Sequence, residues 1–208
     1  MKSKIILFDI DGTLFDASSF LNVFYRILTS IFSLSKEDID RVQIIYDQNK
    51  KENGYFHPSS FQSKITDKFP EVQGDKLQEI LWNIDLFKQN VYKDTSVIES
   101  LSKVAKIGIF SKGDRDFQKK KLISLKDYIA DEDIFIFPEK INKISEILYK
   151  YKDFQVFMVD NEIEVLIKVK NLFPKIETIL IDRKNIYQEA NKILKIKTLE
   201  GLKLIIYD

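Results

Sequence analysis

The sequence contains no cysteine, which excludes disulfide bonds and thiol catalysis. It also has almost no net charge: 33 basic side chains face 32 acidic ones, so no overall field attracts nucleic acid or an anionic membrane. No apolar run approaches the ~20 residues of a membrane span, and the first apolar run is too short for the core of a signal peptide. We therefore expect a cytoplasmic protein that binds a small molecule, with no nucleic acid, membrane or protein partner.

The stretch from Ile5 to Leu14 carries the clearest signal. Four consecutive apolar residues, Ile5 to Phe8, run directly into an acidic turn, which is typical of a buried parallel strand whose carboxyl end opens onto a site. Asp9 and Asp11 stand in this turn, and burying unpaired carboxylates costs several kcal/mol. A divalent cation, best Mg²⁺, is the natural partner for such hard oxygen ligands, and Gly12 allows the backbone to turn tightly beneath a ligand.

The string Asp9-Ile10-Asp11-Gly12-Thr13 resembles the first motif of the haloacid dehalogenase superfamily, Asp-x-Asp-Gly-Thr. Its second aspartate resembles the phosphatase and phosphotransferase branch rather than the dehalogenases. The resemblance implies that Asp9 attacks phosphorus to form an aspartyl-phosphate and that Asp11 is the general acid and base. A carboxylate suits this role, because a covalent intermediate divides one difficult step into two easier ones.

Residues 17–90 are predicted to be helical throughout. Apolar residues such as Phe20, Phe24 and Ile27 recur at helical spacing, and Ser35 with Asp38 forms a capping-box pattern. The resemblance implies that this insert is a helical cap of the C1 type, which closes over the site and selects the substrate. In such a cap His57 and Trp82 are better explained as structural residues than as pocket residues.

The rest of the chain alternates strands with helices. Strands are predicted at 106–110, 133–137, 154–159 and 176–181, while the tail from 193 to 208 fits either a short strand or a closing helix. Such alternation indicates a parallel sheet with ligands bound beyond the carboxyl ends of its strands. We therefore predict an α/β protein: a Rossmann-like three-layer α/β/α core formed by residues 1–16 and 91–208, with residues 17–90 as a helical-bundle cap.

Ser111 directly follows the predicted strand 106–110. In the resembling family a hydroxyl at this point binds the transferring phosphoryl group, and the backbone amide of Lys112 would face the same group. One subgroup of the family has a glutamine and a basic-leucine pair after this motif, matched here by Gln118 and Lys121-Leu122. The run Lys119 to Lys121 is otherwise predicted to be a solvated helix face.

The family's third motif is a lysine that pairs with the nucleophile and the phosphate. Lys140, in a Glu-Lys pair beyond the predicted strand 133–137, is our first choice. Lys143, one helical turn further, is the alternative.

Acidic residues also follow the predicted strand 154–159. Asp160 is the best further metal ligand after Asp9, and in the family the backbone carbonyl of Asp11 completes the protein's share of the Mg²⁺ site. Many members of the resembling family have a second acidic residue immediately after the one that corresponds to Asp160, and this chain has Asn161 at that position. The sequence leaves open whether Asn161, Glu162 or Glu164 completes the site.

The sequence therefore predicts a Mg²⁺-dependent phosphatase of the haloacid dehalogenase superfamily acting on a small phosphorylated metabolite. Asp9 and Asp11 are the predicted catalytic residues, with Ser111, Lys112 and Lys140 binding phosphate. Two alternatives remain open: a phosphomutase that uses the same aspartyl-phosphate, and a non-catalytic module that binds phosphorylated ligands. Phosphonate hydrolysis is less favoured, because no cap lysine stands out for a Schiff base.

Overall fold

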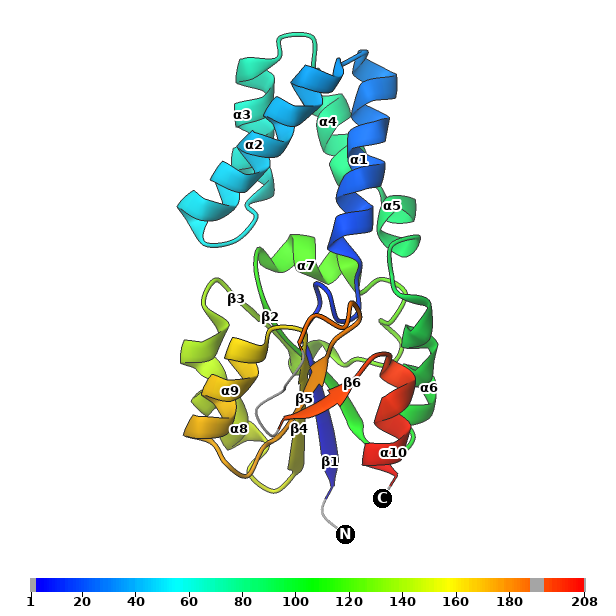
Figure 1. The fold of residues 1–208 in the computed structure, drawn as a ribbon, viewed down its shortest axis with the longest axis vertical. Helices are drawn as coiled ribbons and strands as arrows, with labels where there is room; N and C mark the ends of the chain where they lie inside the picture. The colour runs from blue at the N-terminus through cyan, green and yellow to red at the C-terminus, as the bar shows by residue number, and fades with distance from the viewer. Residues whose placement is uncertain (1–2, 188–192, 208) are drawn as a thin grey trace.

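The computed structural model describes residues 3–187 and 193–207. Its centre is a six-stranded, all-parallel sheet with the strand order β3-β2-β1-β4-β5-β6 (Figure 1). The strands are β1 (Lys4–Phe8), β2 (Lys106–Lys112), β3 (Ile134–Phe137), β4 (Gln155–Asp160), β5 (Glu177–Ile181) and β6 (Leu194–Ile196). Because β1 lies between β2 and β4, the carboxyl ends of these three strands are neighbours.

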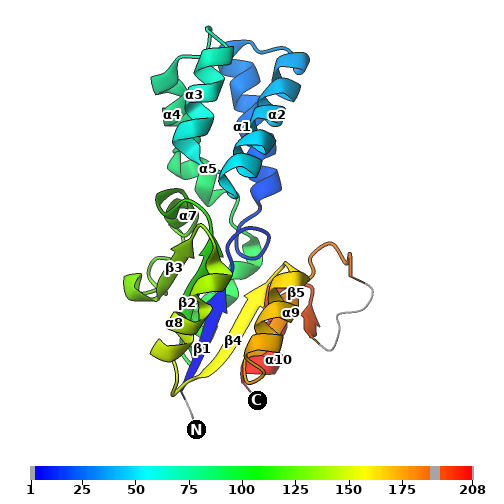
Figure 2. The ribbon, with the colours of Figure 1, turned by 90° about the vertical axis from the view of Figure 1, so that its left-hand side faces the viewer.

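Helices cover both faces of this sheet. Helices α6 (Val97–Leu101) and α10 (Leu202–Ile206) pack on one face, and α8 (Ile144–Lys150) and α9 (Ile163–Leu172) pack on the other (Figures 1 and 2). Alternate residues of β1 supply the two cores: Ile6 and Phe8 face α6 and α10, while Ile5 and Leu7 face α8 and α9. This explains the unbroken apolar run, because a strand buried on both faces needs no polar alternation. The predicted three-layer α/β/α fold is confirmed.

Five helices follow β1 and extend beyond the carboxyl edge of the sheet, and α7 (Arg115–Lys121) lies between them and the sheet (Figures 1 and 2). They are α1 (Ala17–Phe32), α2 (Lys36–Asn53), α3 (Pro58–Lys68), α4 (Gly74–Leu81) and α5 (Ile84–Lys88). The predicted capping box begins α2. A helical insert after the first strand is therefore confirmed.

Short 3₁₀ turns make up the remaining helical elements: η1 (Lys93–Ser96), η2 (Asp131–Asp133), η3 (Lys140–Lys143) and η4 (Leu199–Gly201). The tail, predicted as either strand or helix, contains both, since β6 is followed by η4 and α10; Asp208 lies outside the described residues. In the ranges 3–187 and 193–207, no helix has both the length and the apolar character needed to cross a membrane.

Asp133, the last residue of η2, is buried and contacts side chains from β2 and from the end of α8. Its ionisation should contribute to the stability of the fold. Burial acts to raise the pKa of Asp133, but hydrogen bonds from Lys106, Lys150 and Tyr151 outweigh burial and hold the pKa below its ordinary value. A carboxyl whose pKa is lower in the folded state stabilises the fold above its unfolded pKa of about 3.9, and this stabilisation disappears as the pH falls through the folded pKa.

Replacing Asp133 by asparagine should therefore lower the free energy of unfolding by about 1–3 kcal/mol at neutral pH, with a smaller difference near pH 3. Urea unfolding at the two pH values measures this. Asp153→Asn, at an exposed position between α8 and β4, is the matched control and should change little. A difference between Asp133→Asn and the unmodified protein that is independent of pH would contradict the role given to its charge.

Candidate active site

The carboxyl ends of three adjacent strands gather the polar residues of the site. Asp9 follows β1 directly, and its backbone N–H donates to the carbonyl of Val159 in β4 at 2.9 Å. Ser111 lies near the end of β2, and Asp160 is the last residue of β4. The side chains of Asp9, Ser111 and Asp160 are all buried, at one edge of a sheet whose interior is mainly apolar.

Lys140 connects two of these residues. The residue begins η3, the turn after β3, and its side chain reaches back to the sheet edge with only 5% of the residue exposed. Its Nζ lies 2.7 Å from Oδ1 of Asp9 and 2.7 Å from Oδ2 of Asp160. The alternative, Lys143, has an exposed side chain that pairs with Glu146. The structure therefore brings Lys140, and not Lys143, to Asp9.

The cluster carries more negative charge than Lys140 balances. Burial raises the pKa of Asp9 to about 7; Lys140 opposes this rise, while the carboxylates of Asp160 and Asp11 add to it. Burial likewise raises the pKa of Asp160. Lys140 stays protonated, because the two carboxylates outweigh the effect of burial and raise its pKa. A further cation beside Asp9 and Asp160 would stabilise their ionised forms.

Asp11 is held by a separate set of contacts. The Nζ of Lys121 lies 2.7 and 2.8 Å from its two carboxylate oxygens, and Nε2 of Gln118 donates to it at 2.9 Å. The ammonium of Lys121 also lies 5.2 Å from the ring centroid of Phe15 and 5.1 Å from that of Phe117. These contacts fix the carboxylate of Asp11 against α7.

The prediction that Lys119 to Lys121 form a solvated helix face is wrong for Lys121, of which only 6% is exposed. Its ammonium can be buried because Asp11 and two aromatic rings compensate it. The sequence contained a usable signal: Phe117, Gln118 and Lys121 are spaced by three and four residues and so share one side of a helix. That side faces the site.

The residues beside Asp9 fit a magnesium ion. Within the described parts of the chain, no three acidic or histidine side chains converge as a metal site. Mg²⁺, however, commonly takes only one or two carboxylates together with waters and substrate oxygens, and Asp9 and Asp160 supply two. Oδ1 of Asn161, the residue after Asp160, is buried without a hydrogen-bond partner, as expected for an oxygen that binds a ligand.

The other candidates for completing the metal site are placed differently. Glu162 and Glu164 are both exposed at the start of α9, and the backbone N–H of Glu162 donates to Oδ1 of Asp160 at 2.9 Å. Among the three alternatives, Asn161 has the buried oxygen that still lacks a partner.

Gly12 brings the turn after Asp9 against Asn161. Its φ is +77°, and a Cβ at this position would lie 2.7 Å from Nδ2 of Asn161. Gly12→Ala should therefore lower the free energy of unfolding by about 1–3 kcal/mol and displace Asn161. Gly74→Ala is the control, because its Cβ would meet only ordinary contacts at 3.6 Å. Thermal unfolding measures both, and equal melting temperatures for the two variants would contradict the strain argument.

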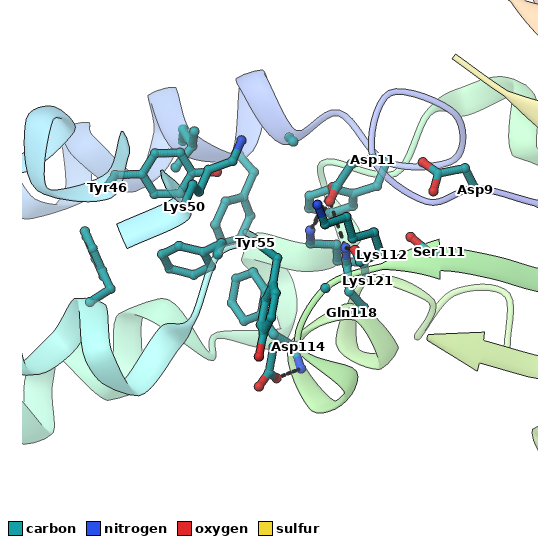
Figure 3. A pocket seen from close by; sticks show the side chains of 18 of the residues that line it. Asp9, Asp11, Tyr46, Lys50, Tyr55, Ser111, Lys112, Asp114, Gln118 and Lys121 are labelled. Atoms are coloured by element: carbon teal, nitrogen blue, oxygen red, sulfur yellow. Dashed lines mark hydrogen bonds and ion pairs between the residues drawn. The ribbon is translucent and has the colours of Figure 1, made fainter. Parts of the chain in front are cut away.

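A cavity of about 270 Å³ lies between the sheet edge and the helical insert (Figure 3). From the core it is lined by Asp9, Asp11, Ser111, Lys112, Gln118, Lys121, Lys140 and Glu162, among others. His57 and Trp82 are absent from its lining: His57 caps α3 by accepting from the N–H of Ser60, and Trp82 packs its ring 5.5 Å from that of Phe117. The cavity therefore joins the predicted catalytic and phosphate-binding side chains in one space.

Arg183 supports the site and was missed in the sequence. Its Nη2 donates to the carbonyl of Thr13 at 2.7 Å, and its guanidinium pairs with Asp94 at 2.9 and 3.0 Å. The same group stacks 3.7 Å from the ring centroid of Tyr92. Arg183 thus connects the Asp-x-Asp-Gly-Thr loop to Tyr92 and Asp94, which follow the helical insert in the chain. Its position two residues after β5, at the same sheet edge, was the available signal.

Comparison with known proteins identifies the fold. The sequence matches no protein-family model and no curated protein. Solved structures do match, and the haloacid dehalogenase-like hydrolase of Burkholderia xenovorans has a TM-score of 0.76 at 19% identity, over 97% of this chain and 98% of that one. The chain has the haloacid dehalogenase-like fold.

Other proteins with this fold carry different activities in their names. The magnesium-bound HAD-hydrolase YfnB of Bacillus subtilis matches with a TM-score of 0.68 at 16% identity, over all of both chains. A HAD phosphatase of Thermococcus onnurineus matches with a TM-score of 0.62 at 22% identity, over 97% of both chains. Further matches are 2-haloacid dehalogenases. Proteins with this fold thus carry different activities in their names, so the fold by itself does not determine the activity of this chain.

Proposed function

We propose that this protein is a Mg²⁺-dependent phosphatase that hydrolyses a small phosphomonoester, a phosphorylated metabolite of the cytoplasm, through an aspartyl-phosphate on Asp9. The observation that carries the proposal is the contact of Lys140 with both Asp9 and Asp160 at the base of a cavity that also contains Asp11. A buried lysine between two carboxylates provides positive charge for the phosphoryl oxygens and opposes the rise in the pKa of Asp9 that burial causes.

The side chains divide the reaction between them. Asp9 attacks phosphorus in line with the leaving oxygen, and Asp11 donates a proton to that oxygen. Ser111, the backbone of Lys112 and the ammonium of Lys140 hold the phosphoryl oxygens. Asp11 then accepts a proton from the water that hydrolyses the aspartyl-phosphate, which restores Asp9.

Magnesium would be held by Asp9, Asp160, the backbone carbonyl of Asp11 and Oδ1 of Asn161. When bound, it supplies positive charge that offsets the repulsion between the carboxylates and the substrate's phosphate. The excess negative charge around Asp9 supports this choice, and one protein with this fold is known with magnesium bound.

Asp11 favours a phosphatase over a dehalogenase. An alkoxide leaving group needs a proton, whereas a halide leaves without one, so a general acid beside the nucleophile suits ester cleavage. The resemblance found in the sequence likewise associates the second aspartate with the phosphatase branch. Asp11 lines the cavity, and Lys121 and Gln118 hold its carboxyl group in place.

The test is phosphate release from a panel of phosphomonoesters, assayed with Mg²⁺ and with a chelator. We expect release from some members that depends on Mg²⁺, and no halide release from 2-haloacids assayed in parallel. Halide release without phosphate release would replace the phosphatase with a dehalogenase. Ligand binding without turnover of any ester would favour the non-catalytic module.

Lys121 should matter for the proton transfer rather than for binding. Lys121→Met keeps an apolar side chain between Phe15 and Phe117 but removes one of the two side chains that orient the carboxyl group of Asp11, so kcat should fall by about 10²-fold with KM little changed. The loss should be larger for an alkyl phosphate than for 4-nitrophenyl phosphate, whose leaving group needs little protonation. Lys120→Met is the control. Equal losses on both substrates would contradict the role of Lys121.

A further inference from the structure

The cavity changes character along its length. At the sheet edge it is polar, with Asp9, Ser111 and Lys140 around the position expected for the phosphoryl group. On the side away from Asp9, Figure 3 shows Tyr46 and Tyr55 together with Lys50 and Asp114, and rings make up a large part of the lining. The aromatic residues of its lining are Phe15, Phe20, Phe24, Tyr46, Tyr55, Phe56, Phe61 and Phe117. A leaving group that extends away from Asp9 therefore enters an aromatic chamber.

The helical insert offers few polar partners to such a leaving group. Of its described residues that line the cavity, only Tyr46, Lys50 and Tyr55 have polar side chains. Lys50 lies with its ammonium 5.4 Å from the ring centroid of Tyr46, at the far end from Asp9 (Figure 3). The insert contributes no acidic, amide or aliphatic hydroxyl side chain to the lining in the part that the structure describes.

This lining discriminates between substrate classes on physical grounds. A sugar carries several hydroxyl groups, and each one that is buried without a hydrogen-bond partner opposes binding. An aromatic ring has no such requirement, and it gains offset or edge contacts with the rings around it. The chamber therefore penalises polyols and accepts a planar apolar body.

We propose, resting on the phosphatase function, that the substrate is a phosphomonoester whose leaving group contains a planar aromatic ring. Tyr55 is the most direct specificity residue of the chamber. It lines the cavity and is half-buried. Among the described residues, its ring makes an aromatic contact only with His57, at 6.2 Å between centroids. The ring of Tyr55 is thus available to a ligand and is little used by the protein's own packing.

The substrate class is tested with three esters of primary alcohols, which have similar intrinsic reactivity. They are benzyl phosphate, cyclohexylmethyl phosphate and the glucose phosphate esterified at the primary hydroxyl. We expect kcat/KM for benzyl phosphate to exceed that of the sugar phosphate by about tenfold or more, with cyclohexylmethyl phosphate between them. A sugar phosphate that is hydrolysed as fast as benzyl phosphate overturns the inference but leaves the phosphatase function standing.

Variants at Tyr55 test whether its ring causes the preference for an aromatic leaving group. Tyr55→Leu should lower the ratio of kcat/KM for benzyl over cyclohexylmethyl phosphate by about threefold, because the ring–ring contact is lost. Tyr55→Phe keeps the ring and should keep the ratio. Tyr149→Leu, at a position on α8 that is 75% exposed, is the control for a tyrosine outside the cavity. An unchanged ratio in Tyr55→Leu overturns the role of Tyr55.

Binding to Asp9→Asn separates this inference from the reaction itself. The variant binds esters without forming the aspartyl-phosphate, so calorimetric Kd values report on the cavity alone. We expect Kd for benzyl phosphate to be about tenfold lower than for the sugar phosphate. Equal or reversed Kd values, or binding of neither ester, overturn the inference. Tight binding of benzyl phosphate to a wild-type protein that hydrolyses no ester refutes the phosphatase function instead.

Discussion

Asp9→Asn is expected to lower kcat for phosphomonoester hydrolysis by about 10⁴-fold or more, the scale of loss when a covalent nucleophile is removed. The amide has the same shape but is a far weaker nucleophile. The fold should survive, because burial already raises the pKa of Asp9 to about 7 and the ionised form is therefore costly in the free protein. An uncharged side chain relieves that cost.

Two measurements on the same purified sample check this expectation: phosphate release and thermal unfolding. Asp153→Asn, an exposed change of the same chemical kind, controls for the general effect of removing a carboxylate. Activity retained by Asp9→Asn would refute the nucleophile assignment. A collapse of its melting temperature would refute the claim that the Asp9 charge opposes folding.

Lys140→Met should be the most damaging single substitution for stability. It leaves the buried carboxylates of Asp9 and Asp160 without the ammonium that both contact at 2.7 Å. Removing one partner of a buried ionic group typically costs about 3–5 kcal/mol in the free energy of unfolding. Turnover should also be lost, because Lys140 is the one lysine in direct contact with the proposed nucleophile among the described residues.

Lys143→Met is the matched control for this substitution. It lies in the same turn, but its side chain is exposed and pairs only with Glu146 in the described structure, so it should change the free energy of unfolding by less than about 0.5 kcal/mol. Urea unfolding with and without Mg²⁺ compares the two variants. We expect Mg²⁺ to restore part of the stability of Lys140→Met, since the ion replaces lost positive charge. Equal destabilisation by both variants would refute the buried contact.

Much of the core was predictable because local rules and tertiary structure agree there. The apolar run before Asp9 is buried on both faces, as its lack of alternation indicated. Ser111 and Asp160 were predictable from their places at the ends of apolar strands, and parallel topology brings those ends together. The first segment of the tail was ambiguous because β6 has only three residues, too few for a periodic pattern.

The contacts that the sequence did not reveal join residues far apart in the chain. Lys121 reaches Asp11 across 110 positions, and Arg183 reaches Thr13 across 170. Helical spacing places Lys121, and not Lys119 or Lys120, on the same side as Phe117 and Gln118. It does not show that this side faces Asp11, because that depends on the direction of α7. The aromatic chamber was also beyond prediction, since its rings look like ordinary helix core until the cavity brings them together.

The most direct test of the proposed mechanism is to find the phosphoryl group on Asp9. Asp11→Asn should slow hydrolysis of the intermediate more than its formation from 4-nitrophenyl phosphate, so the aspartyl-phosphate should accumulate in that variant. Acid quenching, proteolysis and mass spectrometry then locate the added group. The mechanism predicts one phosphoryl group on the peptide that contains Asp9. Turnover with no phosphoryl group on that peptide, or with the group on another residue, would contradict it.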